Sequence, residues 1–343
     1  MRIKVRQKTL RPWSAGLLIS ALACGDDGPS TMTGPDLATA TAVVSKIAFT
    51  SFNQGEDDNS QHIFTVNPDG SGLRQITREG AYRDLDWKPG GAKIAATDGN
   101  DIIAVNADGS GRRNLTSTVG ANESHPVWSP NGSRIVYVRG GEIYVMNADG
   151  TGQRNLTRTT ASESEPNWSP DGSRIVYVKT MSGGATGVHV MNADGSGKRR
   201  LSKTITKWER EPRWSLDGRQ IAFTANRRGT VDIFVIYPNG TGETNLTKDM
   251  AAEIRPYWSP NSNRIVFTPN RTGGPEVFTM GRWGGNKVNL TNTASAEEVA
   301  YGWSPDGTRI LYQTGGNAWV MRADGTGKKQ VSVRAAENLA WSR

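Results

Sequence analysis

Apolar and polar residues alternate with a period of two in short runs, and turns rich in Gly, Asp, Asn and Pro separate these runs. The clearest copy spans residues 168–202, where WSPDGSRIVYVKT is followed after a short gap by VHVMNADGSGKRRLS. A period of two predicts half-buried β-strands. The S-P-D-G and N-A-D-G tetrapeptides predict tight turns, because Pro presets φ and Gly accepts a positive φ. Residues 168–202 are therefore expected to form one antiparallel unit with four strands, a, b, c and d in chain order.

This unit recurs along the chain. A tryptophan ends each strand a, and consecutive copies of this tryptophan are 38 to 46 residues apart. An isoleucine follows seven residues later, in strand b, in six copies. A four-stranded unit repeated at this period is typical of a β-propeller. The repeated tryptophans are Trp87, Trp128, Trp168, Trp214, Trp258, Trp303 and Trp341.

The two ends of the repeat region complement each other. The first strand b, residues 46–50, has no Trp-Ser-Pro ahead of it, and the last strand a, residues 339–343, has no strand b behind it. The C-terminal strand is therefore expected to pair with the N-terminal blade and close the ring, which removes open sheet edges. The prediction is an all-β fold, a seven-bladed β-propeller of four-stranded antiparallel blades over residues 45–343.

The N-terminal segment has the features of an export signal. Residues 1–23 contain five Lys and Arg, no acid, and an apolar run at 15–23 that is too short for a permanent membrane span. Cys24 is the only cysteine, so no intrachain disulfide can form. Its place after Leu22-Ala23 resembles a bacterial lipoprotein signal, with Ala21 where that pattern usually has Leu. We expect a signal peptide at 1–23, lipidated Cys24, and a flexible tether over 24–44; an ordinary cleaved signal is the alternative.

Charge and composition narrow the function classes. The formal net charge is +8, but five positive residues belong to the expected signal peptide. The mature chain would carry 36 Lys and Arg against 33 Asp and Glu, a near balance that does not favour nucleic-acid binding. No Cys/His cluster has metal-ligand spacing, so neither a metal nor a cofactor is expected. The ring is expected to be a monomer.

The repeat resembles a known family. W-S-P-[DN]-G-x-[RK]-I followed by I-[YF]-V-M-N-A-D-G-[ST]-G, as in residues 128–157 and 168–202, resembles the TolB-like (WD40-like) β-propeller repeat. The resemblance implies a propeller in the bacterial cell envelope that binds a protein partner. TolB itself has a mixed α/β domain ahead of six blades, whereas here a short tether precedes seven. With Gly25 after the cysteine, we expect a relative of TolB, held at the periplasmic face of the outer membrane by its lipid.

Copies of the repeat differ mainly in two sets of connections. The a–b and c–d turns hardly vary, whereas the b–c and d–a loops differ in length and content. In a propeller these two sets lie on opposite faces, which we call the turn face and the loop face. Binding residues concentrate in variable loops on a rigid scaffold, so a site is expected on the loop face.

Two rows of polar residues stand where strand a enters from the loop face. The first lies five residues before Trp and the second three residues before Trp, and both are expected to ring the mouth of the central channel. One interpretation is an acidic funnel for a basic peptide segment, a cation or an amine. The other is structural, with each glutamate capping a loop or pairing with Arg227 or Arg271. The first row is Glu123, Glu163, Glu209, Glu253 and Glu298, and the second includes His125, Glu165, Glu211 and Arg255.

Signals for catalysis are weaker. His189 occupies an aromatic position of the repeat and is expected in the core, His62 is expected in solvent, and only His125 points at the channel mouth. No nucleophile elbow or Ser/His/Asp set is brought together by the repeat. We therefore predict a non-catalytic envelope scaffold that binds a protein or peptide, preferably a basic segment, and meets the membrane only through its lipid anchor. The alternative is a carbohydrate-active lyase or hydrolase at the channel mouth, as in related propellers of pectin-degrading lyases.

Overall fold

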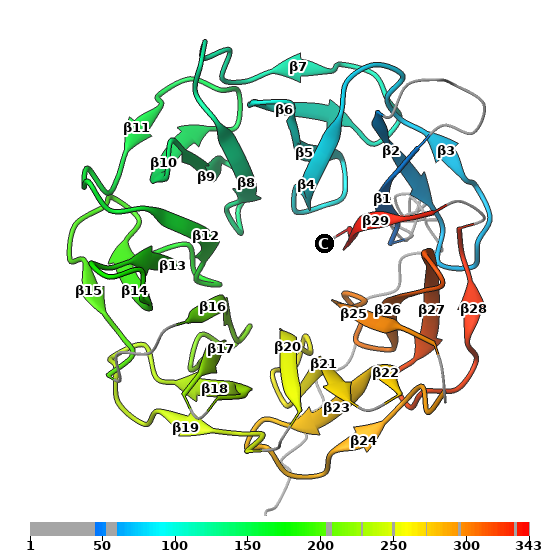
Figure 1. The fold of residues 1–343 in the computed structure, drawn as a ribbon. Coiled ribbons are helices and arrows are strands. Elements are labelled where there is room, and N and C mark those ends of the chain that lie inside the picture. The colour runs from blue at the N-terminus through cyan, green and yellow to red at the C-terminus, as the bar shows by residue number, and fades with distance from the viewer. Residues whose placement is uncertain are drawn as a thin grey trace, which may run out of the picture. The chain divides into compact units, whose positions relative to one another are not determined.

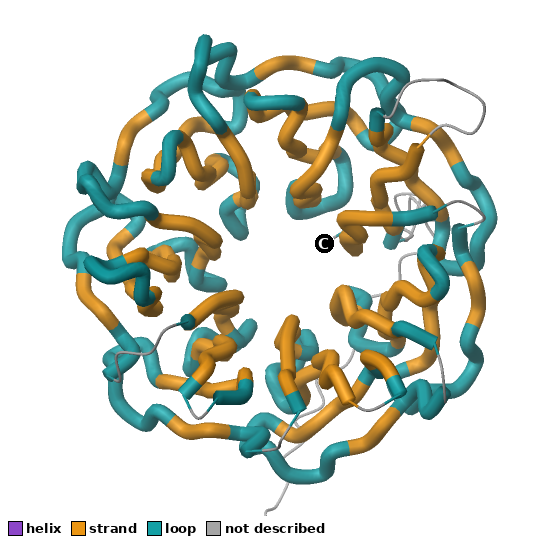
Figure 2. Tube along the Cα trace, in the orientation of Figure 1, coloured by secondary structure: helices purple, strands orange, loops and turns teal. Residues whose placement is uncertain are grey.

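The computed structural model describes residues 45–342 except 53–59, 204–207, 228, 249–250, 272, 294–295 and 333–334. The expected signal peptide, Cys24 and tether lie outside these residues. Val43–Arg343 forms one compact unit, and its described part is built from strands joined by turns and loops (Figure 2). Within the same ranges no helix is long and apolar enough to cross a membrane.

Seven antiparallel sheets stand around a central axis as the blades of a propeller (Figure 1). The seven-bladed all-β fold predicted from the sequence is confirmed. The innermost strands, a, are β29 (Glu337–Trp341), β4 (Tyr82–Trp87), β8 (Glu123–Trp128), β12 (Glu163–Trp168), β16 (Glu209–Trp214), β20 (Ala252–Trp258) and β25 (Glu298–Trp303). Strands b, in the same blade order, are β1 (Ile47–Phe52), β5 (Lys93–Asp98), β9 (Arg134–Arg139), β13 (Arg174–Thr180), β17 (Ile221–Asn226), β21 (Arg264–Arg271) and β26 (Arg309–Thr314).

The two outer strands complete each blade, and we number the blades 1 to 7 in the order above. In blade 6 an extra short strand, β22 (Gly274–Pro275), pairs with the end of β21, so strand c is interrupted there. Strands c are β2 (Gln61–Val66), β6 (Asp101–Asn106), β10 (Glu142–Asn147), β14 (Thr186–Asn192), β18 (Val231–Ile236), β23 (Phe278–Gly281) and β27 (Asn317–Arg322). Strands d are β3 (Arg74–Gln75), β7 (Arg113–Asn114), β11 (Arg154–Asn155), β15 (Arg199–Arg200), β19 (Thr244–Asn245), β24 (Val288–Asn289) and β28 (Lys329–Gln330).

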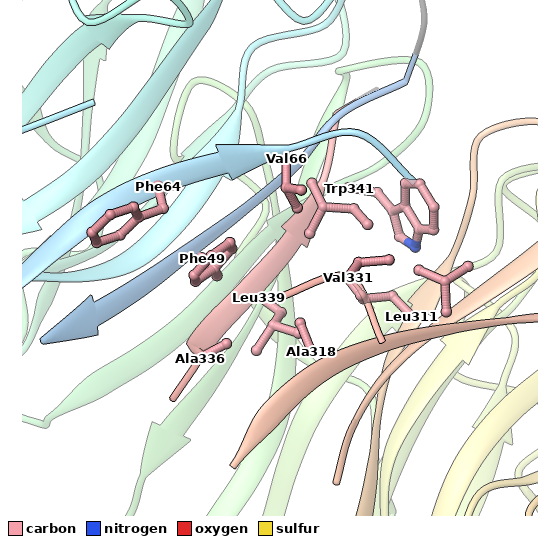
Figure 3. Close-up of a cluster of buried hydrophobic side chains, with 11 residues drawn as sticks. Phe49, Phe64, Val66, Leu311, Ala318, Val331, Ala336, Leu339 and Trp341 are labelled. Atoms are coloured by element: carbon pink, nitrogen blue, oxygen red, sulfur yellow. The ribbon is translucent and has the colours of Figure 1, made fainter. Parts of the chain in front are cut away.

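Blade 1 closes the ring. Its innermost strand β29 comes from the C-terminus and pairs with β1 from the N-terminal side, with Ile47 opposite Trp341. The backbone N–H of Ser342 donates to the carbonyl of Lys46 at 2.7 Å, as Ser129 donates to Arg134 across the a–b turn of blade 3. Apolar side chains of blade 1 then pack on those of blade 7 (Figure 3). The predicted closure by the C-terminal strand is thus confirmed.

The repeated tryptophans connect neighbouring blades. Each is buried, with at most 9% of its surface exposed. In four blades the indole N–H also donates to a carbonyl of the innermost strand in the preceding blade, as Trp168 does to Val127 at 3.1 Å. Trp128, Trp214 and Trp341 have a buried indole nitrogen without such a bond among the described residues. The same tryptophan therefore supplies apolar packing in every blade and a hydrogen bond between blades in four.

This difference leads to a paired prediction. Trp168→Phe should lower the free energy of unfolding by about 1 kcal/mol more than Trp214→Phe, because only the first change removes a hydrogen bond and leaves the carbonyl of Val127 unpaired. Both changes remove similar apolar surface, since both side chains are 6% exposed. Chemical denaturation of the two variants measures the difference, and equal losses would show that the indole bond contributes nothing.

The turns repeat one hydrogen-bonding scheme. In the c–d turn of blade 3, Asp149 Oδ1 accepts from the N–H of Thr151 at 3.0 Å and from its hydroxyl at 2.6 Å, and these two bonds hold the pKa of Asp149 below its usual value. Asn147 Nδ2 donates to the same hydroxyl at 3.0 Å. An aspartate or asparagine that accepts from the backbone two residues later is the standard chemistry of such turns.

Candidate functional site

The innermost strands carry a bulge at the loop face. Pairing between strands a and b shifts register between the residues four and one positions before Trp in six blades. The residue three before Trp, here called the bulge position, has φ between 49° and 57° in the same blades. In blade 7 the shift lies one residue later, and Gly302 takes the positive φ of 125°. The bulge residues are Asp84, His125, Glu165, Glu211, Arg255 and Asn338.

A proline explains why the bulge forms. Pro126, Pro166, Pro212 and Pro256 follow the bulge residue in four blades. Proline has no N–H to give to strand b, so inside a sheet it is confined to edges and bulges. Each proline is buried, which turns the preceding residue toward the channel. The bulge is a feature that the period-two pattern did not predict.

The row of glutamates five before Trp is placed inside the blades and not on the channel surface. Glu123, Glu163, Glu209, Glu253 and Glu298 are all 3% exposed or less. Their expected exposure at the channel mouth is therefore wrong. The bulge accounts for the difference, because it turns the strand between this row and the tryptophan.

Four of these glutamates have partners within their own blade. Glu123 Oε1 accepts from Arg139 Nε at 2.6 Å, and Glu163 lies 3.2 Å from Lys179 Nζ. Glu209 Oε2 accepts from the N–H of Val188 at 2.9 Å. The remaining two contacts join Glu209 Oε1 to Arg227 Nη2 at 3.3 Å and Glu298 Oε2 to the hydroxyl of Thr293 at 2.8 Å. The structural interpretation of this row is supported where its partners are described.

The expected arginine partners have different outcomes. The predicted pairing of Arg227 with the glutamate row is confirmed by its contact with Glu209, and Arg227 also binds Glu243. The side chain of Arg271 lies outside the described residues. Arg139 and Lys179 were missed, although they stand four residues after the isoleucine of strand b, directly opposite the glutamate in the antiparallel register.

The bulge residues form the polar surface of the channel mouth. Their carboxylates accept hydrogen bonds from the bulge N–H of the next blade: Asp84 Oδ2 from His125 at 3.2 Å, Glu165 Oε2 from Glu211 at 2.5 Å, and Glu211 Oε2 from Arg255 at 2.7 Å. Each of these bonds uses one carboxylate oxygen, and a carboxylate offers about four acceptor sites. We call Asp84, Glu165 and Glu211, with His125 between them, the acidic arc.

The acidic arc is only partly in contact with solvent. The side chain of Asp84 is 22% exposed and that of Glu165 is 20% exposed. Burial is the main reason why the pKa of Glu165 lies above the ordinary glutamate value, and the neighbouring charge of Glu211 adds to this, while the hydrogen bond from the Glu211 N–H and the charge of Arg210 oppose it. A carboxylate in such a place attracts a cation more strongly than one in bulk water. The arc is therefore suited to a positively charged group.

The opposite side of the channel has another chemistry. The guanidinium of Arg255 lies 4.6 Å from the ring centre of Tyr301, and that of Arg213 lies 4.1 Å from the ring centre of Tyr257. Arginines stacked on aromatic rings are held in place and retain their charge. Blades 5 to 7 thus present aromatic and basic groups, while blades 2 to 5 present the acidic arc.

The three histidines have separate surroundings. His125 is 48% exposed at the channel mouth, with Nδ1 3.0 Å from the hydroxyl of Ser124 and 4.0 Å from Asp84. His189 packs against Tyr177 with ring centres 5.6 Å apart, as its aromatic position predicted. His62 is fully buried, so its predicted exposure is wrong. Among the described residues no group of three or more His, Cys, Asp or Glu is placed to hold a metal ion.

The closed ring of seven four-stranded blades defines the protein as a β-propeller. Residues 197–340 match the family model of the TolB beta propeller domain. The TolB-like repeat predicted from the sequence is therefore confirmed. A comparison with curated proteins found no match.

Solved structures with a similar fold include scaffolds and enzymes. TolB from Acinetobacter baumannii has a TM-score of 0.55 and 17% identity, covering 87% of this chain and 82% of that one. A puromycin-hydrolyzing peptidase from Mycobacterium tuberculosis has a TM-score of 0.67 and 13% identity, covering 85% of this chain and 54% of the peptidase. An oligogalacturonate lyase in complex with manganese has a TM-score of 0.65 and 11% identity, covering 83% and 85%. At these identities the similarity shows the fold alone.

Proposed function

We propose that the protein is a non-catalytic scaffold of the bacterial cell envelope, which binds a basic segment of a protein or peptide at the channel mouth. The observation that carries this proposal is the acidic arc, three partly exposed carboxylates held on neighbouring blades by hydrogen bonds from backbone N–H groups. A fixed carboxylate needs no reorganisation when a lysine or arginine arrives, so the arc provides both attraction and orientation. The similarity to TolB and the expected lipoprotein signal support the envelope location.

A capture experiment tests the proposal. Residues 45–343 are immobilised and exposed to a solubilised envelope extract, and the retained proteins are identified by mass spectrometry. This part contains every described strand of the closed ring. In the variant Glu165→Gln/Glu211→Gln the amide oxygens still accept the backbone N–H bonds, but the charges are gone. Affinity for a basic partner should fall by about tenfold or more, since each removed charge costs about 1.4 kcal/mol or more in such a pair.

The matched control is Glu79→Gln/Glu297→Gln, which removes two exposed charges of the loop face away from the bulge positions. A partner retained by the control and lost from the arc variant supports the proposal. Equal retention by both variants would contradict it, provided that circular dichroism shows the same folded state for both.

The pH dependence of binding is a further prediction. Because the pKa of Glu165 is raised above 4.5, this carboxylate is protonated, and loses its attraction for a cation, at a higher pH than an exposed glutamate. Affinity for the captured partner should fall as pH is lowered from 7 toward 5, before ordinary carboxylates titrate. Isothermal titration measures it, and Glu165→Gln should flatten the profile. His125→Gln, which cannot gain a proton, separates the contribution of the neighbouring imidazole.

The second candidate function is a carbohydrate-active lyase or hydrolase. The position of His125 beside Asp84 at the channel mouth favours it. An activity on an acidic polysaccharide that His125→Ala abolishes, with the folded state retained, would replace the scaffold proposal. If His125→Ala instead leaves protein capture unchanged and no activity is found, the enzyme interpretation fails.

A further inference from the structure

Charges are distributed unequally between the two faces of the ring. Strands b and d run from the turn face, and five of the seven d strands begin with an exposed base: Arg74, Arg113, Arg154, Arg199 and Lys329. Strands a and c run from the loop face, and five of the seven a strands begin with glutamate. The near balance of charge in the mature chain therefore conceals a basic turn face and an acidic loop face.

The turn face also exposes large apolar side chains. Leu216 is 54% exposed, Tyr237 is 38% exposed and Trp283 is 62% exposed. They belong to turns of blades 5 and 6, which are neighbours in the ring. Leu216 also lines a cavity of about 510 Å³ between the turns of blades 4 and 5, together with Pro170 and Pro238. We call Leu216, Tyr237 and Trp283 the apolar patch.

All three residues depart from the repeat at positions where the usual residue stabilises the turn. Trp283 stands where Asp149 accepts two hydrogen bonds from Thr151 in blade 3, and Tyr237 stands where Asn147 donates to the same hydroxyl. Leu216 replaces the proline of S-P-D-G, which presets the turn. Each departure gives up local stability and exposes apolar surface. Departures of this kind, without a return in packing, are typical of functional surfaces.

A specific contact holds two of these turns together. Arg282, which precedes Trp283, lies 3.1 Å from Asp217, the residue after Leu216. The guanidinium also donates twice to Gln220 Oε1, at 3.1 and 2.8 Å. Blade 6 is thereby fixed against blade 5, and the two exposed side chains are next to the residues that make the contact.

From this arrangement we propose that the turn face docks on an anionic lipid surface. The apolar patch would enter the headgroup region while the rim bases contact lipid phosphates. Tryptophan and tyrosine prefer this interface, and each nearby Lys or Arg adds attraction to anionic lipid. An acidic protein would match the bases but gives no reason for three exposed apolar residues in consecutive blades. A neutral polysaccharide would match the aromatic side chains but not the bases.

The entry of the chain into the ring is consistent with this orientation. Lys46 N donates to Ser342 Oγ at 2.7 Å, at the place that an a–b turn occupies in other blades. The chain therefore enters the ring on the turn face. A lipid on Cys24 would act on the same face, but the proposal does not depend on it.

Vesicle co-sedimentation of residues 45–343 tests the proposal without the signal segment or Cys24. The vesicles are phosphatidylcholine alone or phosphatidylcholine with 30% phosphatidylglycerol. Binding is expected only to the second and should weaken with salt. Arg113→Gln/Arg154→Gln should reduce the partition coefficient by about tenfold or more, at about fivefold per base. Trp283→Asn, which returns a turn-forming residue, should reduce it by about tenfold.

Matched controls lie on the loop face. Val119→Asn replaces an equally exposed apolar residue, and Arg78→Gln/Lys248→Gln removes two exposed bases. Neither control should change sedimentation. The proposal is overturned if the ring fails to sediment with anionic vesicles, if it binds both vesicle types equally, or if the loop-face controls lose as much binding as the turn-face variants.

Discussion

Deletion of residues 336–343 is expected to abolish the cooperative unfolding of the ring and to cause self-association. The deletion removes β29, the innermost strand of blade 1, and with it the buried side chains of Leu339 and Trp341. It also leaves the N–H and C=O groups of β1 unpaired at a sheet edge. Two buried side chains of this size contribute about 3–6 kcal/mol by themselves, which is a large part of the stability of a typical domain. Calorimetry and size-exclusion chromatography measure the two effects.

A circular permutant provides the control. Ser342 and Lys46 are related in the same way as Ser129 and Arg134, which four residues connect. Joining Ser342 to Lys46 through Pro-Asp-Gly-Ser and opening the chain in the a–b turn of blade 4 should retain a monomeric, cooperatively folding ring. If the permutant also fails to fold, the defect of the deletion cannot be assigned to the missing strand alone.

Glu209→Ala is expected to lower the free energy of unfolding by about 3–5 kcal/mol, the usual cost of breaking a buried charged pair. The Glu209 carboxylate is fully buried and accepts from the Val188 N–H, and Arg227 lies 3.3 Å away. Its removal leaves a buried backbone donor unpaired and reduces the neutralisation of a mostly buried guanidinium. Urea denaturation measures the change.

Two variants make this measurement decisive. Glu209→Gln keeps an acceptor for Val188 but loses the charge, so its loss should be smaller than that of Glu209→Ala. Glu79→Ala removes an exposed glutamate of the loop face and should change stability by less than about 0.5 kcal/mol. If Glu209→Ala were as mild as Glu79→Ala, the glutamate row would have no structural role at this position.

The fold could be predicted because each blade repeats the same local signals. Trp168, the S-P-D-G turn and the alternating run at 175–178 each constrain local structure, and their repetition gives the number of blades. Closure could be predicted from the missing partners at the two ends. The interruption of strand c in blade 6 could not, because Gly273 and Gly274 allow a path that no periodic pattern describes.

The site could be predicted only in part. The sequence places two polar rows near the channel mouth, but a strict period of two assigns both to the same surface. Pro166 after Glu165 is the signal that separates them, because a proline inside a strand indicates a bulge. Spacing alone would also have placed Asp84 with His125 and Glu165. Which atoms accept from which N–H depends on the angle between blades, and no local pattern contains that angle.

The positive φ at the bulge position has an evolutionary consequence. Aspartate, histidine, glutamate, arginine and asparagine all occupy this same backbone conformation in one ring. The strand therefore does not require a particular side chain there, although β-branched residues would be strained. Two residues earlier, a change of glutamate affects the core. Single substitutions at the bulge can thus alter what the channel mouth recognises while the blades keep their stability, and a duplicated gene could acquire a new partner one blade at a time.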